Sequence, residues 1–450
     1  MSPADVAALR GALAGAVIAP ADSGYDVARR CYNALIDRRP AAIARCFSDE
    51  DVAAAFAFAG DQGLEGAVRG GGHNPSGHCV CDDGLVIDLT LMRRVEVDAE
   101  RRIARSQGGA TWLDFDSATQ AAGLATPGGV VGTTGVAGLT FGGGIGHLTA
   151  QHGLTCDNLL AAAVVTPTGE VVRAGPGGDE ELLWGLRGGG GNFGVATRLE
   201  FRLHPVDRVL GGRITYVGDE VGEALRVYRD VTVAASDEFS CSSLMATDDE
   251  LRPVLLVFPC YTGTETEPEE LRALRSAPGL AVDSVQAQSF VQQQHLINPP
   301  YGDERSYWKG HFVRELPDEL IDALLARIRT LRLPAGQVLI ESLHGAPKRV
   351  DPGGAAAGFR SAAFNLSAMG GWLDPSYDEE GIQWTRDTAA AMAPWSSSGG
   401  GYINYMQADE PIERVRAAFG HEKFERLQAL KARYDPGNVL RRNQNIPPLD

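Results

Sequence analysis

The first 205 residues combine short apolar runs with turn residues. Residues 85–89 and 95–98 have the alternation and the β-branched content of short strands, and the first follows a turn at Asp82-Asp83-Gly84. Thr111 with Asp114 three residues later predicts a capped helix that ends at Gly123 and turns Trp112 inward. We also expect a helix after residue 156 and a strand at residues 160–166.

Residues 207–400 have a different pattern, in which longer strands alternate with amphipathic helices. Strands are expected at residues 212–216, 240–246, 254–261, 337–344 and 361–369, and helices at residues 222–235, 318–331 and 377–393. This order predicts a sheet covered on one face by helices. Closer to the end, residues 402–406 have strand character, and residues 423–434 form a helix before the break at residues 435–438.

The length and the glycine content divide the chain further. A chain of 450 residues is long enough for at least two hydrophobic cores. It contains 55 glycines, which are about 12% of its residues against a usual share of ~7%. The glycines concentrate in residues 60–146 and 185–194. We therefore expect one domain at 1–206, a second at 207–400 and a separate segment at 401–450.

Charge and cysteine usage exclude several classes of protein. The net charge of −17, with acidic residues dispersed, argues against nucleic-acid binding. No run of 18 apolar residues is present, so no membrane association is expected. Residues 11–21 resemble a signal peptide, but Leu9, Leu13 and Val17 have helical spacing, which favours a folded helix. Seven cysteines without repeated spacing favour a reducing, cytoplasmic location.

The glycine clusters contain one literal dinucleotide fingerprint, formed by Gly189, Gly191 and Gly194. That fingerprint must open a helix, whereas residues 195–201 alternate like a strand, so a nicotinamide site is disfavoured. A P-loop, an H-E-x-x-H helix and a G-x-S-x-G elbow are absent from the sequence.

Residues 69–77 are more informative, because three consecutive glycines precede His73. Such a loop can lie flat on a bulky ligand and donate backbone N–H groups to phosphates. A zinc site formed by His73 with His78, Cys79 and Cys81 is a weaker alternative, because no second ligand cluster follows, and no metal is expected. Further glycine-rich pieces at 127–129, 135–138, 142–146 and 187–194 indicate a large, flat, phosphate-bearing cofactor.

In their order and spacing these segments resemble the FAD-binding domain of the vanillyl-alcohol oxidase and p-cresol methylhydroxylase superfamily, in its berberine-bridge-enzyme-like branch. The resemblance runs from about residue 20 to residue 205 and resumes at residues 401–447. It implies an α+β protein with a p-cresol-methylhydroxylase-type (PCMH-type) FAD domain and a substrate domain whose antiparallel sheet is covered by helices. The cofactor residues it implies are Arg69, Gly70, Gly71, Gly72, His73, Asn74, Gly77, Pro127, Gly128, Thr133, Gly135, Gly138, Gly142, Gly143, Gly144, Gly146, Asn158, Gly191, Asn192, Phe193, Gly194, Val195, Asn443 and Asn445.

The resemblance also implies that His73 bonds covalently to the flavin 8-methyl group. Many relatives add a second bond through a cysteine just before a Val-Gly-x-x-Gly-type turn. In this sequence Val131 occupies that position, and valine cannot form a thioether. Cys156 falls at a different motif position and is interpreted as a buried cysteine. FAD attached by a single bond is therefore expected.

Candidate catalytic residues come from two regions. Residues 401–405 resemble the family's active-site strand, on which Tyr402 and Asn404 would face one side and Tyr405 the other. A tyrosine there would need a neighbour that depresses its pKa before it could act as a base at neutral pH. In the second region, strand alternation alone does not place a further group of polar residues relative to the flavin: His311, Glu341, His344, Asn365 and Ser367.

The function implied is that of an FAD-dependent oxidoreductase. We expect an oxidase that removes a hydride from an alcohol or amine carbon of a small molecule, such as a secondary metabolite or a sugar, and reduces molecular oxygen to hydrogen peroxide. An oxygen-insensitive flavin dehydrogenase and a cyclic amine oxidase are alternatives within this class. A noncatalytic binding protein on the same scaffold and a nucleotide-sugar or NAD-dependent enzyme are weaker ones. The substrate, the catalytic base and the oligomeric state stay open.

Overall fold

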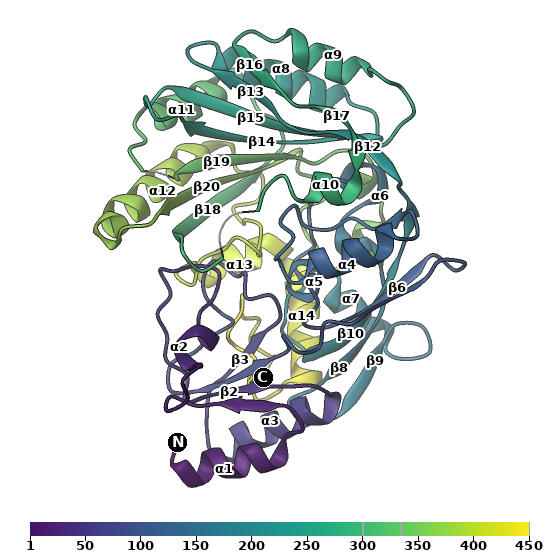
Figure 1. Cartoon of the computed structure of the whole chain (residues 1–450), viewed down its shortest axis with the longest axis vertical. Helices are drawn as coiled ribbons and strands as arrows, with labels where there is room; N and C mark the ends of the chain where they lie inside the picture. The colour runs from purple at the N-terminus through teal and green to yellow at the C-terminus, as the bar shows by residue number, and fades with distance from the viewer. Residues whose placement is uncertain (299–300, 334, 450) are drawn as a thin grey trace.

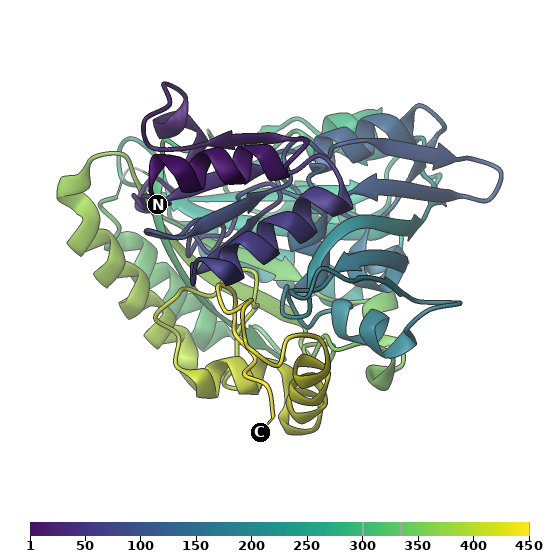
Figure 2. The same ribbon diagram turned by 90° about the horizontal axis from the view of Figure 1, so that it is seen from below.

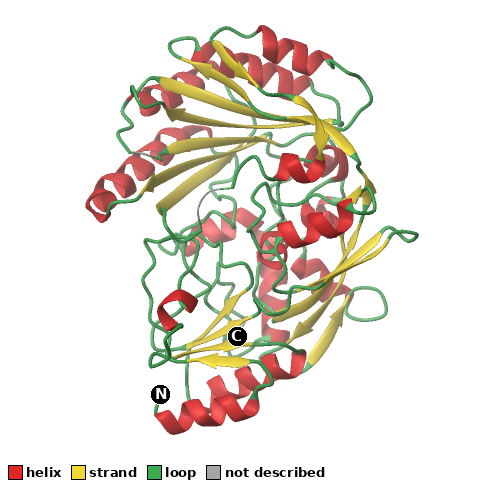
Figure 3. Ribbon diagram, in the orientation of Figure 1, coloured by secondary structure: helices red, strands yellow, loops and turns green. Residues whose placement is uncertain are grey.

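The architecture is described from a computed structural model that covers residues 1–298, 301–333 and 335–449. Two smaller sheets near the N-terminus lie on one side of the molecule, and a large sheet lies on the other (Figure 1). Figure 3 shows that the region between them is filled largely by loops. None of the helices in the described ranges is long and apolar enough to cross a lipid bilayer.

The first sheet has the strand order β1-β2-β4-β3, and its strands β2, β4 and β3 are parallel. Helix α1 (Pro3–Ala12) begins in a capping box between Ser2 and Asp5 and buries Leu9. The helix expected from the spacing of Leu9, Leu13 and Val17 is wrong beyond Ala12, because Leu13 is already extended and Val17 lies in β1 (Ala16–Ile18). Figure 2 shows α1 beside α3 (Asp49–Asp61) on the outer face of this sheet. The strands are β1 (Ala16–Ile18), β2 (Ala42–Arg45), β3 (Gly66–Arg69) and β4 (Leu85–Asp88).

The second sheet is antiparallel, in the order β5-β6-β10-β8-β9. Helix α4 (Trp112–Gln120) has the expected capping box between Thr111 and Asp114 and buries Trp112. The strands are β5 (Val95–Asp98), β6 (Ile103–Gln107), β8 (Leu159–Val165), β9 (Val171–Ala174) and β10 (Val195–Arg202). The helices and turns around the sheet are α2 (Tyr25–Ala28), α5 (Val136–Phe141), α6 (Thr149–His152), η1 (Thr155–Asn158) and α7 (Glu180–Leu186).

Nine strands of the described chain form the large sheet, and every pairing in it is antiparallel. The strands are β12 (Arg208–Gly211), β13 (Ile214–Val217), β14 (Phe239–Thr247), β15 (Pro253–Tyr261), β16 (Leu280–Asp283), β17 (Gln286–Ser289), β18 (Arg305–Val313), β19 (Gln337–Ser342) and β20 (Phe364–Trp372). The covering helices are α8 (Val221–Ala234), α9 (Glu269–Ser276), α11 (Asp318–Arg329) and α12 (Asp378–Met392). Figure 3 shows them on the outer face of the sheet, as the alternating pattern predicts.

The two faces of this sheet differ in what they contact. On β19, Val338 and Ile340 belong to the core under the helices, whereas Leu339 belongs to a separate apolar cluster on the opposite face. Because successive side chains of a strand point to opposite faces, Glu341 follows Leu339 onto that opposite face. This open face looks toward the N-terminal loops (Figure 1).

Shorter elements complete the chain. A two-stranded ladder joins β7 (Leu124–Ala125) to β11 (His204–Pro205) between the sheets. The others are α10 (Phe290–Gln294), η2 (Ala346–Lys348), η3 (Pro352–Gly354), η4 (Pro375–Tyr377), η5 (Ala393–Trp395), α13 (Ile412–Phe419) and α14 (His421–Tyr434).

Two further expected elements are wrong. The helix expected after residue 156 is only the single 3-10 turn η1, because the chain enters β8 at Leu159. The strand expected at residues 402–406 is a turn, closed by a hydrogen bond of 2.9 Å from the Tyr405 N–H to the Tyr402 carbonyl. Strand alternation therefore does not govern which way the side chains of this segment point.

A buried ion pair fastens α14 to the glycine-rich half of the molecule. Lys431 is fully buried and donates to Asp435 at 2.6 Å. It also donates to the carbonyls of Asn192 and Leu440, each at 2.9 Å. Burial lowers the pKa of Lys431, and the nearby Asp435 carboxylate opposes that shift. This ammonium therefore joins the C-terminal stretch of residues 431–440 to Asn192, which is distant in sequence.

We predict that Lys431→Met lowers the free energy of unfolding by about 3–5 kcal/mol, because it leaves the Asp435 carboxylate buried without its cation. Chemical denaturation followed by tryptophan fluorescence measures the change. Arg433→Met is the matched control on the same helix, because Arg433 pairs with Asp179 while its side chain is 61% exposed. That variant is expected to cost less than about 1 kcal/mol. Equal losses in the two variants would contradict a special role for the buried pair.

Candidate functional site

A cavity of about 270 Å³ lies where the N-terminal loops meet the open face of the large sheet. Its walls come from five glycine-rich or C-terminal segments together with Tyr32 and with Trp308 of β18. The segments contribute residues 70–74, 129–131 with 134–135 and 138–139, 190–191, 403–405 and 442–444, and the lining is completed by Val68, His78, Cys79 and Ile145. The glycine clusters and the C-terminal segment thus converge on one space, although they are distant in sequence.

Glycines allow two of these loops to touch through their backbones. A Cβ atom added at Gly71 would lie 2.3 Å from the Gly135 nitrogen, and one added at Gly135 would lie 2.5 Å from the Gly71 nitrogen. Gly72 has a φ of +71°, and a Cβ there would lie 2.3 Å from the Tyr301 hydroxyl. A side chain at these positions would collide with its neighbours. The loops can therefore pack this closely beside the cavity only because glycine occupies them.

The loop at residues 71–74 offers donors to a ligand. Among the described residues, the backbone N–H groups of Gly71, Gly72, His73 and Asn74 have no hydrogen-bond acceptor. Side chains at the cavity are also incompletely paired, since His78 Nε2 and Asn443 Oδ1 are buried without a partner. Unpaired polar groups beside a cavity fit a large polar ligand that carries phosphate and a heteroaromatic ring.

His73 is held firmly at the wall of the cavity. Its Nε2 lies 2.7 Å from the Thr133 hydroxyl, and its ring stacks on Tyr32 with 4.4 Å between centroids. Burial lowers the pKa of His73 to about 4. The imidazole is therefore neutral at physiological pH, and a neutral imidazole is the nucleophilic form.

Behind the sheet-side wall, a buried acid lines a smaller adjoining cavity of about 20 Å³. Asn365 of β20 donates to Glu341 of β19 at 2.7 Å, and the nearby Tyr405 hydroxyl tends to lower the pKa of this carboxyl. Burial raises the pKa of Glu341 to about 7. Tyr405 lines the cavity, and burial together with the charge of Glu341 raises its pKa well above the usual value. A buried carboxyl group that titrates near neutrality close to a tyrosine of the cavity wall is suited to accept a proton.

The polar residues of the large sheet lie on different sides of it. Glu341, Asn365 and Ser367 alternate with helix-covered residues and so face the loops. His311 faces the helices instead, where its Nε2 contacts the Ala389 carbonyl at 3.1 Å. His344 lies beyond the end of β19, and its Nε2 contacts the Phe239 carbonyl at 2.9 Å. Strand alternation could have grouped these residues, but it could not tell which face the helices cover.

Of the three residues expected to be catalytic, Tyr402 is placed differently. Its hydroxyl accepts hydrogen bonds from the Gly144 N–H at 3.0 Å and from the Asn404 amide at 2.9 Å. It is not part of the cavity lining, whereas Asn404 and Tyr405 are. The Tyr402 hydroxyl therefore holds the glycine loop at residues 142–144 in place.

The expected cofactor residues fall into two groups. Those that line the cavity are Gly70, Gly71, Gly72, His73, Asn74, Gly135, Gly138, Gly191 and Asn443. Those outside its lining are Arg69, Gly77, Pro127, Gly128, Thr133, Gly142, Gly143, Gly144, Gly146, Asn158, Asn192, Phe193, Gly194, Val195 and Asn445. Val131, at the position of the second flavin bond in relatives, lines the cavity.

Arg69 and Phe193 show why some of the expected cofactor residues do not line the cavity. The Arg69 guanidinium is buried and turns away, donating to the carbonyl groups of Ala28 and Arg29. Phe193 is fully buried in the hydrophobic core beneath the loops. Both residues shape the loops from behind.

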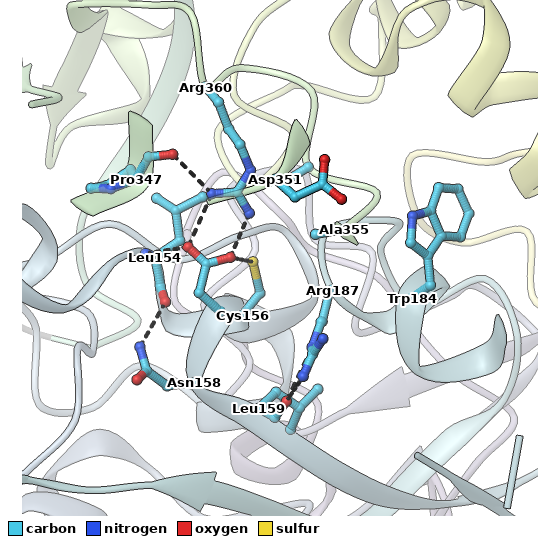
Figure 4. A network of polar contacts seen from close by, with 12 residues as sticks. Leu154, Cys156, Asn158, Leu159, Trp184, Arg187, Pro347, Asp351, Ala355 and Arg360 are labelled. Atoms are coloured by element: carbon cyan, nitrogen blue, oxygen red, sulfur yellow. Dashed lines mark hydrogen bonds and ion pairs between the residues drawn. The ribbon is translucent and has the colours of Figure 1, made fainter. Parts of the chain in front are cut away.

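Cys156 and Asn158 belong to a buried polar network (Figure 4). Asp157 pairs with Arg360 and accepts a hydrogen bond from the Leu154 N–H at 2.9 Å. The Cys156 thiol lies 3.8 Å from Asp157, and burial raises its pKa. The Asn158 amide donates to the Leu154 carbonyl at 3.1 Å. Because Arg360 lies between β19 and β20 in sequence, this network joins the large sheet's segment to the N-terminal half.

Comparison with known proteins agrees with the site. A family model described as FAD binding domain matches residues 40–175, and one described as berberine and berberine like matches residues 401–447. (R)-6-hydroxynicotine oxidase of Paenarthrobacter nicotinovorans is 32% identical over 451 residues, covering 96% of this chain and 97% of that protein.

Solved structures agree as well. The crystal structure of 6-hydroxy-D-nicotine oxidase from Arthrobacter nicotinovorans has a TM-score of 0.89 and 31% identity, covering 97% of this chain and 98% of that one. Xylooligosaccharide oxidase from Myceliophthora thermophila has the same fold, with a TM-score of 0.86 at 21% identity over 99% of this chain and 100% of that one. These findings confirm FAD binding and an enzymatic, small-molecule function. The chain belongs to the FAD-linked oxidoreductases with a PCMH-type FAD domain, in their berberine-bridge-enzyme-like branch.

Proposed function

We propose that this enzyme is an oxidase that removes a hydride from an alcohol or amine carbon of a small ring compound. The observation that supports this proposal is the buried Glu341 carboxyl, which titrates near neutrality close to Tyr405, a residue of the cavity wall. Bound FAD would supply the hydride acceptor and pass the electrons to molecular oxygen, giving hydrogen peroxide. The protein itself must hold the substrate and take up its proton.

We assign the uptake of the substrate proton to Tyr405 and Glu341. A substrate hydroxyl or amine beside Tyr405 gives its proton to the phenol oxygen while the phenol proton moves to the Glu341 carboxylate. Tyrosine alone is a poor base because its pKa lies near 10 or above. Glu341 overcomes this difficulty, since its pKa of about 7 leaves a substantial ionised fraction at neutral pH. The Asn365 amide orients the carboxylate from the other side.

The surroundings favour an apolar ring as substrate over a sugar. Val130 and Ile145 line both the main cavity and a smaller one of about 20 Å³ that contains Glu341. Trp308 presents its ring edge-on to Tyr405, with 5.3 Å between centroids. The open face of the sheet nearby carries an apolar cluster of Leu244, Phe258, Leu339 and Met369. A sugar would need several hydrogen-bonding partners here, whereas an aromatic or cyclic amine or alcohol matches this lining. The relative named (R)-6-hydroxynicotine oxidase is consistent with that class.

We further propose a single covalent bond between FAD and His73. The Nε2 atom of His73 is hydrogen-bonded to the Thr133 hydroxyl, so Nδ1 is the ring nitrogen available for the covalent bond. The neutral state of the ring keeps a lone pair free for it. Val131 has no sulfur with which to form a second bond.

We predict that small aromatic or cyclic secondary amines and alcohols bleach the visible flavin band under nitrogen, and that admitting air restores the band with release of peroxide. An anaerobic substrate panel read by absorbance, followed by a peroxide assay, makes the measurement. Bleaching by sugars alone would contradict the proposed substrate class. Bleaching that air does not reverse would indicate a dehydrogenase.

With a substrate from that panel, Glu341→Gln is expected to slow flavin reduction by about 10²–10⁴-fold, because the proton acceptor is lost. The wild-type rate should rise with pH through about 7 as Glu341 ionises, and the variant should lack this limb. Stopped-flow measurement of the flavin reduction rate from about pH 5 to about pH 9 tests both expectations.

Asp116→Asn is the matched control for that experiment. Burial also raises the pKa of Asp116 to about 7, but this carboxyl lies on α4 against Gln294, outside the cavity lining. Its loss should preserve both the rate and the pH limb. A limb that disappears in the Asp116 variant and persists in the Glu341 variant would overturn the assignment.

For the covalent bond, His73→Ala should release all flavin into the supernatant on acid precipitation, whereas the wild-type pellet stays yellow. His78→Ala is the control, because His78 also lines the cavity and is buried in the same loop. Its flavin should remain in the pellet. Flavin that is fully extractable from the wild-type protein would refute the bond.

A further inference from the structure

Two cysteines meet directly behind the loop that carries His73. Cys31 and Cys79 are both buried, and they belong to the same small hydrophobic cluster. The two thiols are close enough for each to shift the pKa of the other. Each also donates to a backbone carbonyl, Cys31 to Asn33 at 3.6 Å and Cys79 to Gly72 at 3.7 Å. The chain brings them together because the Tyr32 N–H donates to the Gly72 carbonyl at 3.0 Å, which draws residues 31–32 against the loop.

Cys79 also contacts the cofactor cavity. It contributes to the cavity lining, and its sulfur lies 3.7 Å from the Gly72 carbonyl oxygen. The neighbouring Cys31 thiol and the adjacent Arg69 guanidinium lower the pKa of Cys79, while Cys79 and burial raise the pKa of Cys31. Cys79, the sulfur that reaches the cavity, is therefore the more acidic thiol of the pair.

The neighbouring Cys81 has a different environment. It lies two residues farther along and is equally buried, with its sulfur 3.8 Å from the Glu65 carbonyl. Burial and the charge of Glu65 raise the pKa of Cys81 to about 12. It is not part of the cavity lining. The geometry therefore distinguishes one reactive pair from a cysteine of the same loop that is not activated.

We propose that Cys31 and Cys79 form a peroxide-reactive thiol pair whose product is a disulfide that cross-links residue 31 to the His73 loop. Tyr32, next to Cys31, stacks on His73, so this bond would tie the stacking residue to the flavin-binding loop. Hydrogen peroxide as the physiological oxidant rests on the oxidase function proposed above. The thiol chemistry itself does not depend on that function.

The reaction consists of two balanced steps. The Cys79 thiolate attacks one oxygen of hydrogen peroxide, the O–O bond breaks, and hydroxide leaves, so that Cys79 becomes a sulfenic acid. The Cys31 sulfur then attacks the Cys79 sulfur, the S–O bond breaks, and the oxygen departs as water with the Cys31 proton. The hydroxide takes up the proton that Cys79 released on ionisation, so the two thiols lose two electrons in total and one peroxide is reduced to two waters.

The test uses the full-length flavoprotein and added hydrogen peroxide, with no substrate. After exposure, free thiols are alkylated in denaturant and the peptides are analysed by mass spectrometry. We expect a peptide pair joined through Cys31 and Cys79, reversible by dithiothreitol, and two fewer free thiols per chain. Cys79 should be consumed at least about tenfold faster than Cys81.

Three variants sharpen the result. Cys79→Ser should abolish the cross-link, whereas Cys31→Ser should leave a Cys79 sulfenic acid that dimedone traps. Cys81→Ser is the control and should form the cross-link at the wild-type rate. Cys31 and Cys79 that remain fully alkylatable in the wild-type protein, or peroxide that oxidises Cys81 equally fast, would overturn the proposal. Because the peroxide is added, a negative result here leaves the oxidase function untouched, and failure of every substrate in the flavin assay leaves this test unchanged.

Discussion

The contact between the backbones of Gly71 and Gly135 is the constraint on which the site depends. Any side chain at either position would collide with the opposite main chain, so the two loops can meet only as glycine. Their contact brings Thr133 beside His73 and places the free N–H groups of residues 71–74 at the cavity. The glycine excess is therefore a condition of close packing around a flat cofactor, and the loops that lie behind the cavity support this contact.

Burial, more than charge pairing, creates the reactive groups of this protein. Glu341 and Asp116 both have pKa values raised to about 7, and in both cases burial is the main cause. Their positions separate them, because only Glu341 is linked through a tyrosine to the cavity. His73 is neutral for the same physical reason. His73 is thus available as a neutral nucleophile at the cavity wall, and Glu341 as a proton acceptor behind it.

Much of the fold could be predicted because local rules and tertiary packing agree there. The Thr111 and Asp114 capping box begins α4 where expected, and the amphipathic helices cover the large sheet. The prediction failed at residues 401–405, where polar bonds outweigh strand propensity. The Tyr402 hydroxyl there receives hydrogen bonds from Gly144 and Asn404, and the chain turns to allow both. Gly144 lies 258 residues before Tyr402, so no local pattern could reveal this contact.

By itself, the sequence determined the glycine loops, the histidine beside them and the valine in place of a second attachment site, since each of these depends on residue type at a short spacing. Only the tertiary structure decided which acid faces the cavity, which tyrosine reaches it and which cysteines meet. The physical reason is that these choices depend on which sheet face the helices cover and on contacts such as that between Cys31 and Cys79, which the chain makes only after it has folded.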